Sequence, residues 1–233
     1  GTLPARYYFD PEVFEREKEE IWFKTWQFVG YAFDLKEPGD YITADILDQK
    51  LFVVRGKDGA LRAFYNVCMH RGHILVEGKG NRRIFACPFH AWSYDAQGHL
   101  KAAGNAENVA GFEHADFGLS EIRVETVLGL LVFVNLDPGA ATLASQIEGL
   151  EAQVYETVQD FDKMVFARRD DFDVKANWKF IFDQLECYNC PVVHPEATES
   201  VDWSLRRHWE YGVWQRHNQR LRSDLDNEKL SEG

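Results

Sequence analysis

The sequence is poor in cysteine and in positive charge, and it has no long apolar run. Four cysteines among 233 residues are too few for a small disulfide-stabilised scaffold. The chain carries 38 Asp and Glu residues against 26 Lys and Arg, a net charge of −12, which argues against nucleic acid or an anionic membrane as a partner. No stretch reaches the roughly 18 consecutive apolar residues of a transmembrane helix, and residues 1–4 lack the features of a signal peptide. We therefore expect a cytoplasmic protein that does not enter a membrane.

The first part of the chain has the pattern of a small antiparallel β domain. Asp10, Pro11 and Glu12 supply a helix N-cap, a first-turn proline and a first-turn acid, so we expect a helix over residues 11–24. Beyond it, short apolar stretches lie between turn residues, as in strands and hairpins. We assign residues 37–139 to this domain, with strands expected over 41–46, 51–55, 61–67, 83–86, 91–94, 122–127 and 130–135.

The rest of the chain has a mixed character. We expect a helix over residues 143–158, a strand over 164–174, and a second helix over 177–189 that Asn177 caps. The last thirty or so residues are polar and charged, and we expect them to be helical. Together the two parts predict an α+β protein.

Two cysteine–histidine pairs form the strongest motif. Cys68-Met69-His70 is followed, after sixteen residues, by Cys87-Pro88-Phe89-His90. Two facing loops of this kind can offer two sulfurs to one iron and two imidazole nitrogens to the other, which is the ligation of a Rieske [2Fe–2S] cluster. The alternative is a zinc site, which uses the same ligand set. Zinc fingers, however, usually close with a helical histidine pair, whereas here each histidine lies beside its own cysteine.

The residues around these pairs resemble those of the Rieske non-heme iron oxygenase α subunits. Arg71-Gly72 after the first pair matches the family pattern CxHRG. The run from Cys87 through Trp92 and Tyr94 to Leu100 resembles the pattern CPxHxWxYxxxGxL. The resemblance implies that Cys68, His70, Cys87 and His90 hold the cluster. Surface or packing roles are expected for the three other histidines of this region, His73, His99 and His114.

A later segment resembles the same family. Asn177-Trp178-Lys179 and the run from Glu186 to Pro195 look like the family segment NWK…(D/E)xxHxxxxH, and especially like members that read ECYHCxxxHP, some of which oxidise quaternary amines. Mononuclear Fe(II) oxygenases use two histidines and one carboxylate on one face of the metal. The resemblance makes His194 an iron ligand. It also implies that Glu186 bridges to His90 of a neighbouring subunit, and hence a homotrimer.

The segment departs from the pattern at Asn189, which stands where the family has its first iron histidine. A neutral amide oxygen is a weaker ligand than imidazole, so we expect lower iron affinity. Asn189 could be an engineered substitution or a natural variant. Cys187 and Cys190 could be metal ligands at i and i+3 of a helix, or small packing residues beside the iron.

The chain is also shorter than the family pattern after Pro195. Residues 218–223 and 230–233 faintly resemble the family's C-terminal helix. We therefore expect residues 1–36 and 140–233 to form a helix-grip-like catalytic domain that lacks much of its central sheet. The third iron ligand is normally an acid at the start of that helix. Glu210 is the best positional match and Asp202 the second, although both could be solvated acids.

The resemblance implies a terminal oxygenase with a [2Fe–2S] cluster and mononuclear Fe(II). Electrons from NAD(P)H would arrive through a separate reductase, a ferredoxin or both. With O2, the enzyme would hydroxylate an aromatic ring or oxidatively demethylate an N-methylated amine. The alternative is a cluster-only electron-transfer or inactive oxygenase-like protein that lacks mononuclear iron because of Asn189.

Overall fold

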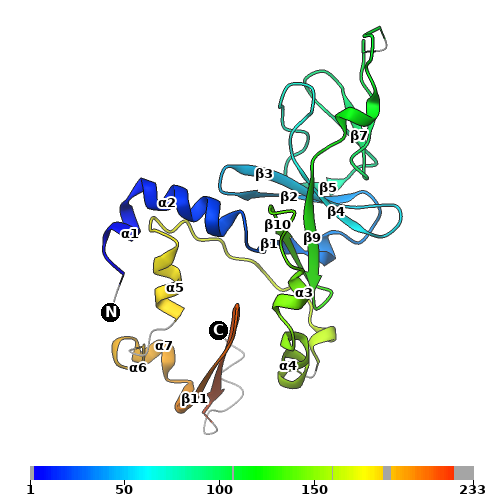
Figure 1. Cartoon of the computed structure of the whole chain (residues 1–233). Helices are drawn as coiled ribbons and strands as arrows, with labels where there is room; N and C mark the ends of the chain where they lie inside the picture. Colours follow the sequence, from blue (N-terminus) through cyan, green and yellow to red (C-terminus); the bar gives the residue numbers. More distant parts are fainter. Residues whose placement is uncertain (1–2, 107, 159, 186–189, 223–233) are drawn as a thin grey trace. The chain divides into compact units, whose positions relative to one another are not determined.

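The computed structural model describes residues 3–106, 108–158, 160–185 and 190–222 (Figure 1). Its internal contacts divide the chain into two units. We call Pro11–Ser145 the β-rich unit, and Gly1–Asp10 together with Gln146–Gly233 the mixed unit. Within the described ranges, no helix combines the length and the apolar character needed to cross a bilayer.

Two antiparallel sheets form the β-rich unit. The larger sheet has the strand order β1-β10-β9-β4-β3-β2-β5, and the smaller one has the order β6-β7-β8. This agrees with the α+β, antiparallel expectation. The larger sheet consists of β1 (Gln27–Tyr31), β2 (Asp40–Ile46), β3 (Gln49–Arg55), β4 (Leu61–Tyr65), β5 (Lys79–Asn81), β9 (Glu121–Val127) and β10 (Leu131–Asn135); the smaller sheet consists of β6 (Ile84–Ala86), β7 (Ser93–Asp95) and β8 (Leu100–Ala102).

Strand β3 is buried on both faces, which explains its continuous apolar run. Because successive side chains of a strand point to opposite faces, Leu51 and Val53 enter one core cluster and Phe52 and Val54 enter the other. The hydrophobic core that contains Phe52 also contains Phe85, from β6 of the small sheet. One face of the large sheet therefore supports the small sheet that carries half of the cysteine–histidine motif.

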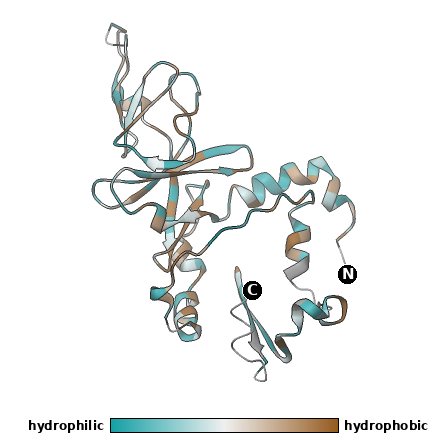
Figure 2. Ribbon diagram, turned by 180° about the vertical axis from the view of Figure 1, so that it is seen from behind, coloured by the Kyte–Doolittle hydropathy of each residue, from teal (hydrophilic) through white to brown (hydrophobic). Residues whose placement is uncertain are grey.

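The N-terminal helix of the β-rich unit begins at the expected proline. It consists of α2 (Pro11–Glu17) followed by the π-helical turn η1 (Lys18–Trp22), close to the expected range of 11–24. Glu12, Glu15 and Arg16 are exposed on this helix, and Figure 2 shows its ribbon as largely hydrophilic. Trp22 packs against the core cluster on the other face of the large sheet. The remaining short helices of the unit are η2 (Ala32–Asp34), η3 (His114–Phe117) and α3 (Leu143–Gln146), the last of which ends at the boundary.

Helix α5 (Lys179–Leu185) of the mixed unit begins near the predicted cap residue. The side-chain oxygen of Asn177 accepts a hydrogen bond from the backbone N–H of Lys179 (3.1 Å), as the sequence predicted. The Tyr8 hydroxyl donates to Asp183 at 2.8 Å, which ties the N-terminal residues to α5. The other elements are α1 (Arg6–Phe9), α4 (Leu150–Thr157), η4 (Phe161–Lys163), α6 (Cys190–Val193), α7 (Pro195–Thr198), β11 (Val201–Tyr211) and β12 (Trp214–Leu221).

Three expectations for the mixed unit are corrected. The strand expected over 164–174 is not formed. These residues have no regular secondary structure, and no described strand pairs with them. The helix expected over 143–158 is divided at Gly149, whose φ of 81° leaves the helical region. The last part of the chain, expected to be helical, forms a hairpin of β11 and β12 over 201–221.

Candidate metal centre

Two turns with the same backbone pattern carry the cysteine–histidine pairs. Cys68 donates its N–H to the carbonyl of His73 at 2.8 Å, and Gly72 donates back to the carbonyl of Cys68 at 2.9 Å. In the second turn, Cys87 donates to the carbonyl of Trp92 at 2.7 Å, and Ala91 donates back to Cys87 at 2.9 Å. In each turn the cysteine therefore exchanges hydrogen bonds with residues four and five positions later.

The fourth residue after each cysteine takes a left-handed conformation. Gly72 has φ 71° and Ala91 has φ 60°. Glycine adopts this conformation without a side-chain clash, whereas alanine pays a steric cost. The chain reverses direction at this residue in each loop, so the histidine that precedes it lies at the tip of the loop.

The four predicted ligands come together with their thiols inside and their imidazoles outside. The side chains of Cys68 and Cys87 are 2% and 4% exposed. His90 is exposed and His70 is half-buried, and the centroids of their rings are 4.8 Å apart. The fold thus offers one pair of sulfur donors and one pair of nitrogen donors from opposing loops.

This arrangement fits a two-iron cluster better than zinc. A structural zinc ion needs four donors at about 2.0–2.3 Å from one point. Across the described ranges, no three His, Cys, Asp or Glu side chains are grouped closely enough to hold a single metal ion. A Rieske cluster instead takes two protein ligands on each iron, so two separate pairs of donors suit it.

Aromatic side chains support both pairs. The Tyr94 hydroxyl lies 3.4 Å from the sulfur of Cys68 and accepts the backbone N–H of Met69 at 3.0 Å. The indole of Trp92 stacks on the His70 ring with centroids 4.8 Å apart and an interplanar angle of 11°. Phe112 and Phe117 pack edge-on against Trp92, at 5.6 and 5.5 Å. The sequence predicted the four ligand candidates but not these supporting contacts, which join residues twenty or more positions apart.

The surroundings favour neutral side chains at two of these positions. Burial, followed by the neighbouring His90 and Arg71, lowers the pKa of His70. Metal binding requires the neutral imidazole, so this shift favours the ligand form. Burial, followed by the contact with Cys68, raises the pKa of Tyr94 far above its usual value and keeps the phenol protonated as a hydrogen-bond donor.

The three other histidines of this unit make structural contacts. The His73 ring lies 2.6 Å from the carbonyl of Ile74, the His99 ring 3.3 Å from Asp95, and the His114 ring packs near Phe112.

The described residues of the mixed unit do not by themselves assemble the expected mononuclear iron site. Glu186, Cys187 and Asn189 lie outside the described residues. His194 is exposed, and its backbone N–H donates to the carbonyl of Cys190, a half-buried residue. Asp202 accepts hydrogen bonds from the N–H and hydroxyl of Ser204.

Glu210 is on strand β11 and not at the start of a helix, which corrects the context in which it was chosen. Its side chain is 80% exposed, and it lies 3.4 Å from the His208 ring. The signal for a strand was present in the sequence, since Trp209 and Tyr211 alternate and Gly212-Val213 forms a two-residue turn before Trp214. The charge of the segment led to the helical interpretation.

Comparison with known proteins agrees with this geometry. Residues 25–113 match the family described as Rieske [2Fe–2S] domain, and residues 161–231 match the catalytic domain of the ring-hydroxylating alpha subunit. The chain is homologous to the Rieske oxygenase α subunits. The Rieske motif and the segment around His194 lie within these two matches.

Among curated relatives, the carnitine monooxygenase oxygenase subunit of Escherichia coli (strain K12) is 41% identical over 215 residues, which are 91% of this Rieske chain and 57% of the relative. The glycine betaine monooxygenase oxygenase subunit of Chromohalobacter salexigens is 34% identical, covering 86% of this chain and 44% of the relative. The chain thus spans about half of the length of these relatives.

Solved structures show the same fold. The quaternary ammonium Rieske monooxygenase CntA in complex with L-carnitine matches with a TM-score of 0.87 and 35% identity, over 94% of this chain and 62% of that one. Naphthalene 1,2-dioxygenase from Rhodococcus sp. matches with a TM-score of 0.75 and 28% identity, over 85% and 47%.

Proposed function

We propose that this chain is the terminal oxygenase component of a Rieske oxygenase system that oxidises a quaternary amine. The observation that carries the proposal is the pair of matched loops, which brings two buried thiols and two surface imidazoles together. The choice of an amine over an aromatic ring rests on similarity, because relatives named for carnitine and glycine betaine are 41% and 34% identical. Naphthalene 1,2-dioxygenase is 28% identical.

The ligand residues have distinct tasks in this proposal. When bound, the cluster supplies single electrons at a potential that its neutral imidazole ligands raise. Cys68 and Cys87 anchor it in the interior, where their burial excludes water. His70 and His90 form the exposed side, where Glu186 of a neighbouring copy would meet His90 in a homotrimer.

The mononuclear site is assigned to the segment around His194. When bound, an Fe(II) ion held by two histidines and one carboxylate supplies open positions for O2 and substrate. We propose His194 as one ligand, position 189 as the second, and Glu210 or Asp202 as the acid. Asn189 would hold the metal weakly.

The test is a reconstituted assay with the cluster-loaded protein, a ferredoxin and its NAD(P)H-dependent reductase. Carnitine, glycine betaine and naphthalene are supplied separately under 18O2, and products are measured by mass spectrometry. We expect labelled or demethylated product from an amine and none from naphthalene. Turnover of naphthalene alone would reverse the substrate assignment.

A second candidate is a cluster-only electron-transfer protein. One observation favours it: Asn189 stands where the family pattern has an iron histidine. Iron analysis separates the two candidates. About three irons per chain support the oxygenase, and two support the electron carrier.

A further inference from the structure

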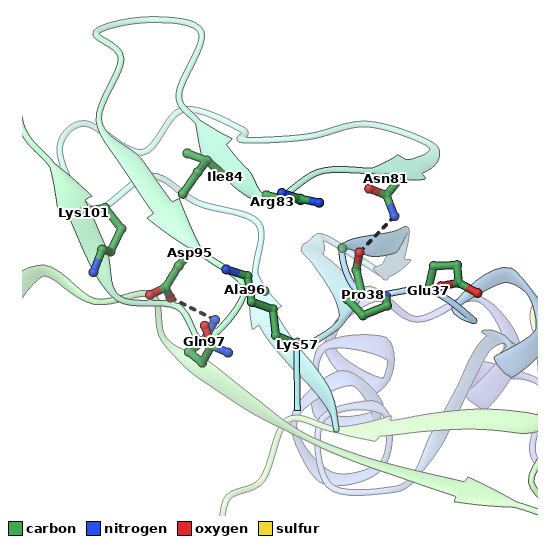
Figure 3. A pocket seen from close by; sticks show the side chains of 11 residues that line it. Glu37, Pro38, Lys57, Asn81, Arg83, Ile84, Asp95, Ala96, Gln97 and Lys101 are labelled. Carbon is green, nitrogen blue, oxygen red and sulfur yellow. Dashed lines mark hydrogen bonds between the residues drawn. The ribbon is translucent and has the colours of Figure 1, made fainter. Parts of the chain in front are cut away.

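A large polar hollow lies in the β-rich unit, away from the histidine tips. It has a volume of about 900 Å³ and is lined by residues of the β2–β5 edge and of the small sheet (Figure 3). Three cationic side chains, Lys57, Arg83 and Lys101, surround it, and we call it the basic hollow. Ile84, 46% exposed, supplies an apolar patch on the same wall.

The three cations are not neutralised within the described part of the chain. No ion pair or hydrogen bond engages Lys57, Arg83 or Lys101 there, whereas other cations of the unit pair with aspartates: Lys50 with Asp45, Arg62 with Asp58, and Lys79 with Asp34.

Two acids also line the hollow, and they differ in how far their carboxylates are already hydrogen-bonded within the chain. Asp95 is occupied, because its carboxylate accepts the N–H groups of Gln97 and His99 and contacts the His99 ring. Glu37 is exposed and lies near Asn81 (Figure 3). The lining therefore carries three cations against two carboxylates, a small excess of positive charge on a chain whose net charge is −12.

The wall of the hollow leads to the thiolate side of the cluster site. Ile84 begins β6, and Cys87 follows the end of that strand, about 10 Å along an extended chain. Asp95 ends β7 and is adjacent to Tyr94, whose hydroxyl lies 3.4 Å from the sulfur of Cys68. His70 and His90 lie at the loop tips, beyond the opposite ends of these strands.

We propose that the basic hollow docks the acidic face of a plant-type [2Fe–2S] ferredoxin, or of a ferredoxin-like domain of a reductase, and this inference rests on the proposed function. Ferredoxins of this type have lower potentials than Rieske clusters. The reduced ferredoxin is oxidised by one electron, and the cluster held by Cys68, His70, Cys87 and His90 is reduced by one. No bond forms or breaks. Electrons enter on the cysteine side, which leaves the histidine side for the neighbouring subunit.

The chain offers a closely matched control for this surface. Arg82 is the sequence neighbour of Arg83, but it lines a different groove with His73 and Pro88, nearer the ligand loops. Both arginines are exposed, so Arg82→Glu and Arg83→Glu change the net charge equally. A donor that docks in the Arg82 groove would respond to the first substitution and not to the second.

The experiment measures binding of an oxidised plant-type ferredoxin to the cluster-loaded protein by calorimetry, at low and high ionic strength. We expect Lys57→Glu/Arg83→Glu/Lys101→Glu to weaken binding at least about tenfold at low salt and to flatten the salt dependence. Arg83→Glu alone should weaken it severalfold, and Arg82→Glu should leave it within about twofold. In stopped-flow experiments, reduction of the Rieske cluster by the reduced ferredoxin should be slowest in the triple variant, intermediate in Arg83→Glu and near the wild-type rate in Arg82→Glu. Reduction of the cluster by dithionite should be unchanged in all three.

Unchanged ferredoxin affinity in the triple variant, a larger effect of Arg82→Glu, or absence of binding by the wild-type protein would overturn the docking surface. These results leave the proposed function intact as long as dithionite still reduces a Rieske-type cluster. A protein without such a cluster would instead remove the proposed function itself.

Discussion

Tyr94 places its hydroxyl oxygen 3.4 Å from the sulfur of Cys68 and accepts the N–H of Met69 on the same oxygen. The backbone donor occupies one lone pair, so the phenolic hydrogen is available to the sulfur. Hydrogen bonds to cluster sulfurs stabilise the more negative, reduced form and raise the potential.

Replacing Tyr94 with Phe should therefore lower the reduction potential of the cluster. A hydrogen bond worth about 1 kcal/mol corresponds to about 40 mV for one electron. Protein-film voltammetry measures the change, and Tyr65→Phe, in a half-buried tyrosine of the large sheet, serves as the control. An equal potential in Tyr94→Phe and wild type would show that the hydroxyl does not act on the sulfur.

Trp92 should control how firmly the cluster is retained. Its indole stacks on His70 and is itself enclosed by Phe112 and Phe117. Trp92→Leu removes this support and should cost about 3 kcal/mol, with partial loss of the cluster. Trp92→Phe keeps a ring and should retain most of it. Iron and acid-labile sulfide per chain provide the measurement, and equal retention in both variants would contradict the support role.

Gly72 tests the backbone of the first ligand turn. An added Cβ would meet no atom within 4 Å, so Gly72→Ala changes only the strain at φ 71°. We expect a loss of about 1 kcal/mol in unfolding free energy, seen as a lower Tm of the cluster-loaded protein. Gly104→Ala is the matched control, because that position is equally open and has no positive φ. If both substitutions lower the Tm equally, strain at the turn is not the cause.

Local patterns were sufficient to predict much of the β-rich unit. The apolar run at 51–55 and the turn at Asp58–Gly59 are properties of neighbouring residues, and the structure has β3 and a hairpin there. The spacing of the two cysteine–histidine pairs likewise predicted two facing loops, and the structure brings the His70 and His90 rings together. The contacts of Tyr94 and Trp92 could not be, because they depend on how two loops face each other.

The mixed unit shows why the remaining predictions were wrong. Residues 164–174 have strand-like composition, but a strand requires a pairing partner, and none of the described segments provides one. Residues 201–221 were expected to be helical because they are rich in charge, but they form the β11–β12 hairpin. Gly212, with φ 67°, lies in its turn. Strand formation here depends on the cross-strand pairs of the hairpin, such as His208 with His217, and not on the charge of the segment.

Asn189→His tests the interpretation of the departure from the family pattern. Imidazole is a stronger iron ligand than an amide oxygen, so the substitution should strengthen retention of the mononuclear iron, bring the iron content closer to three per chain and increase O2-dependent turnover. The cluster spectrum should stay unchanged, because its ligands lie in the other unit. Asn177→His adds an imidazole at another asparagine of the same unit and should add no iron. Iron content that stays near two in Asn189→His would favour the electron-transfer candidate and remove position 189 from the proposed iron site.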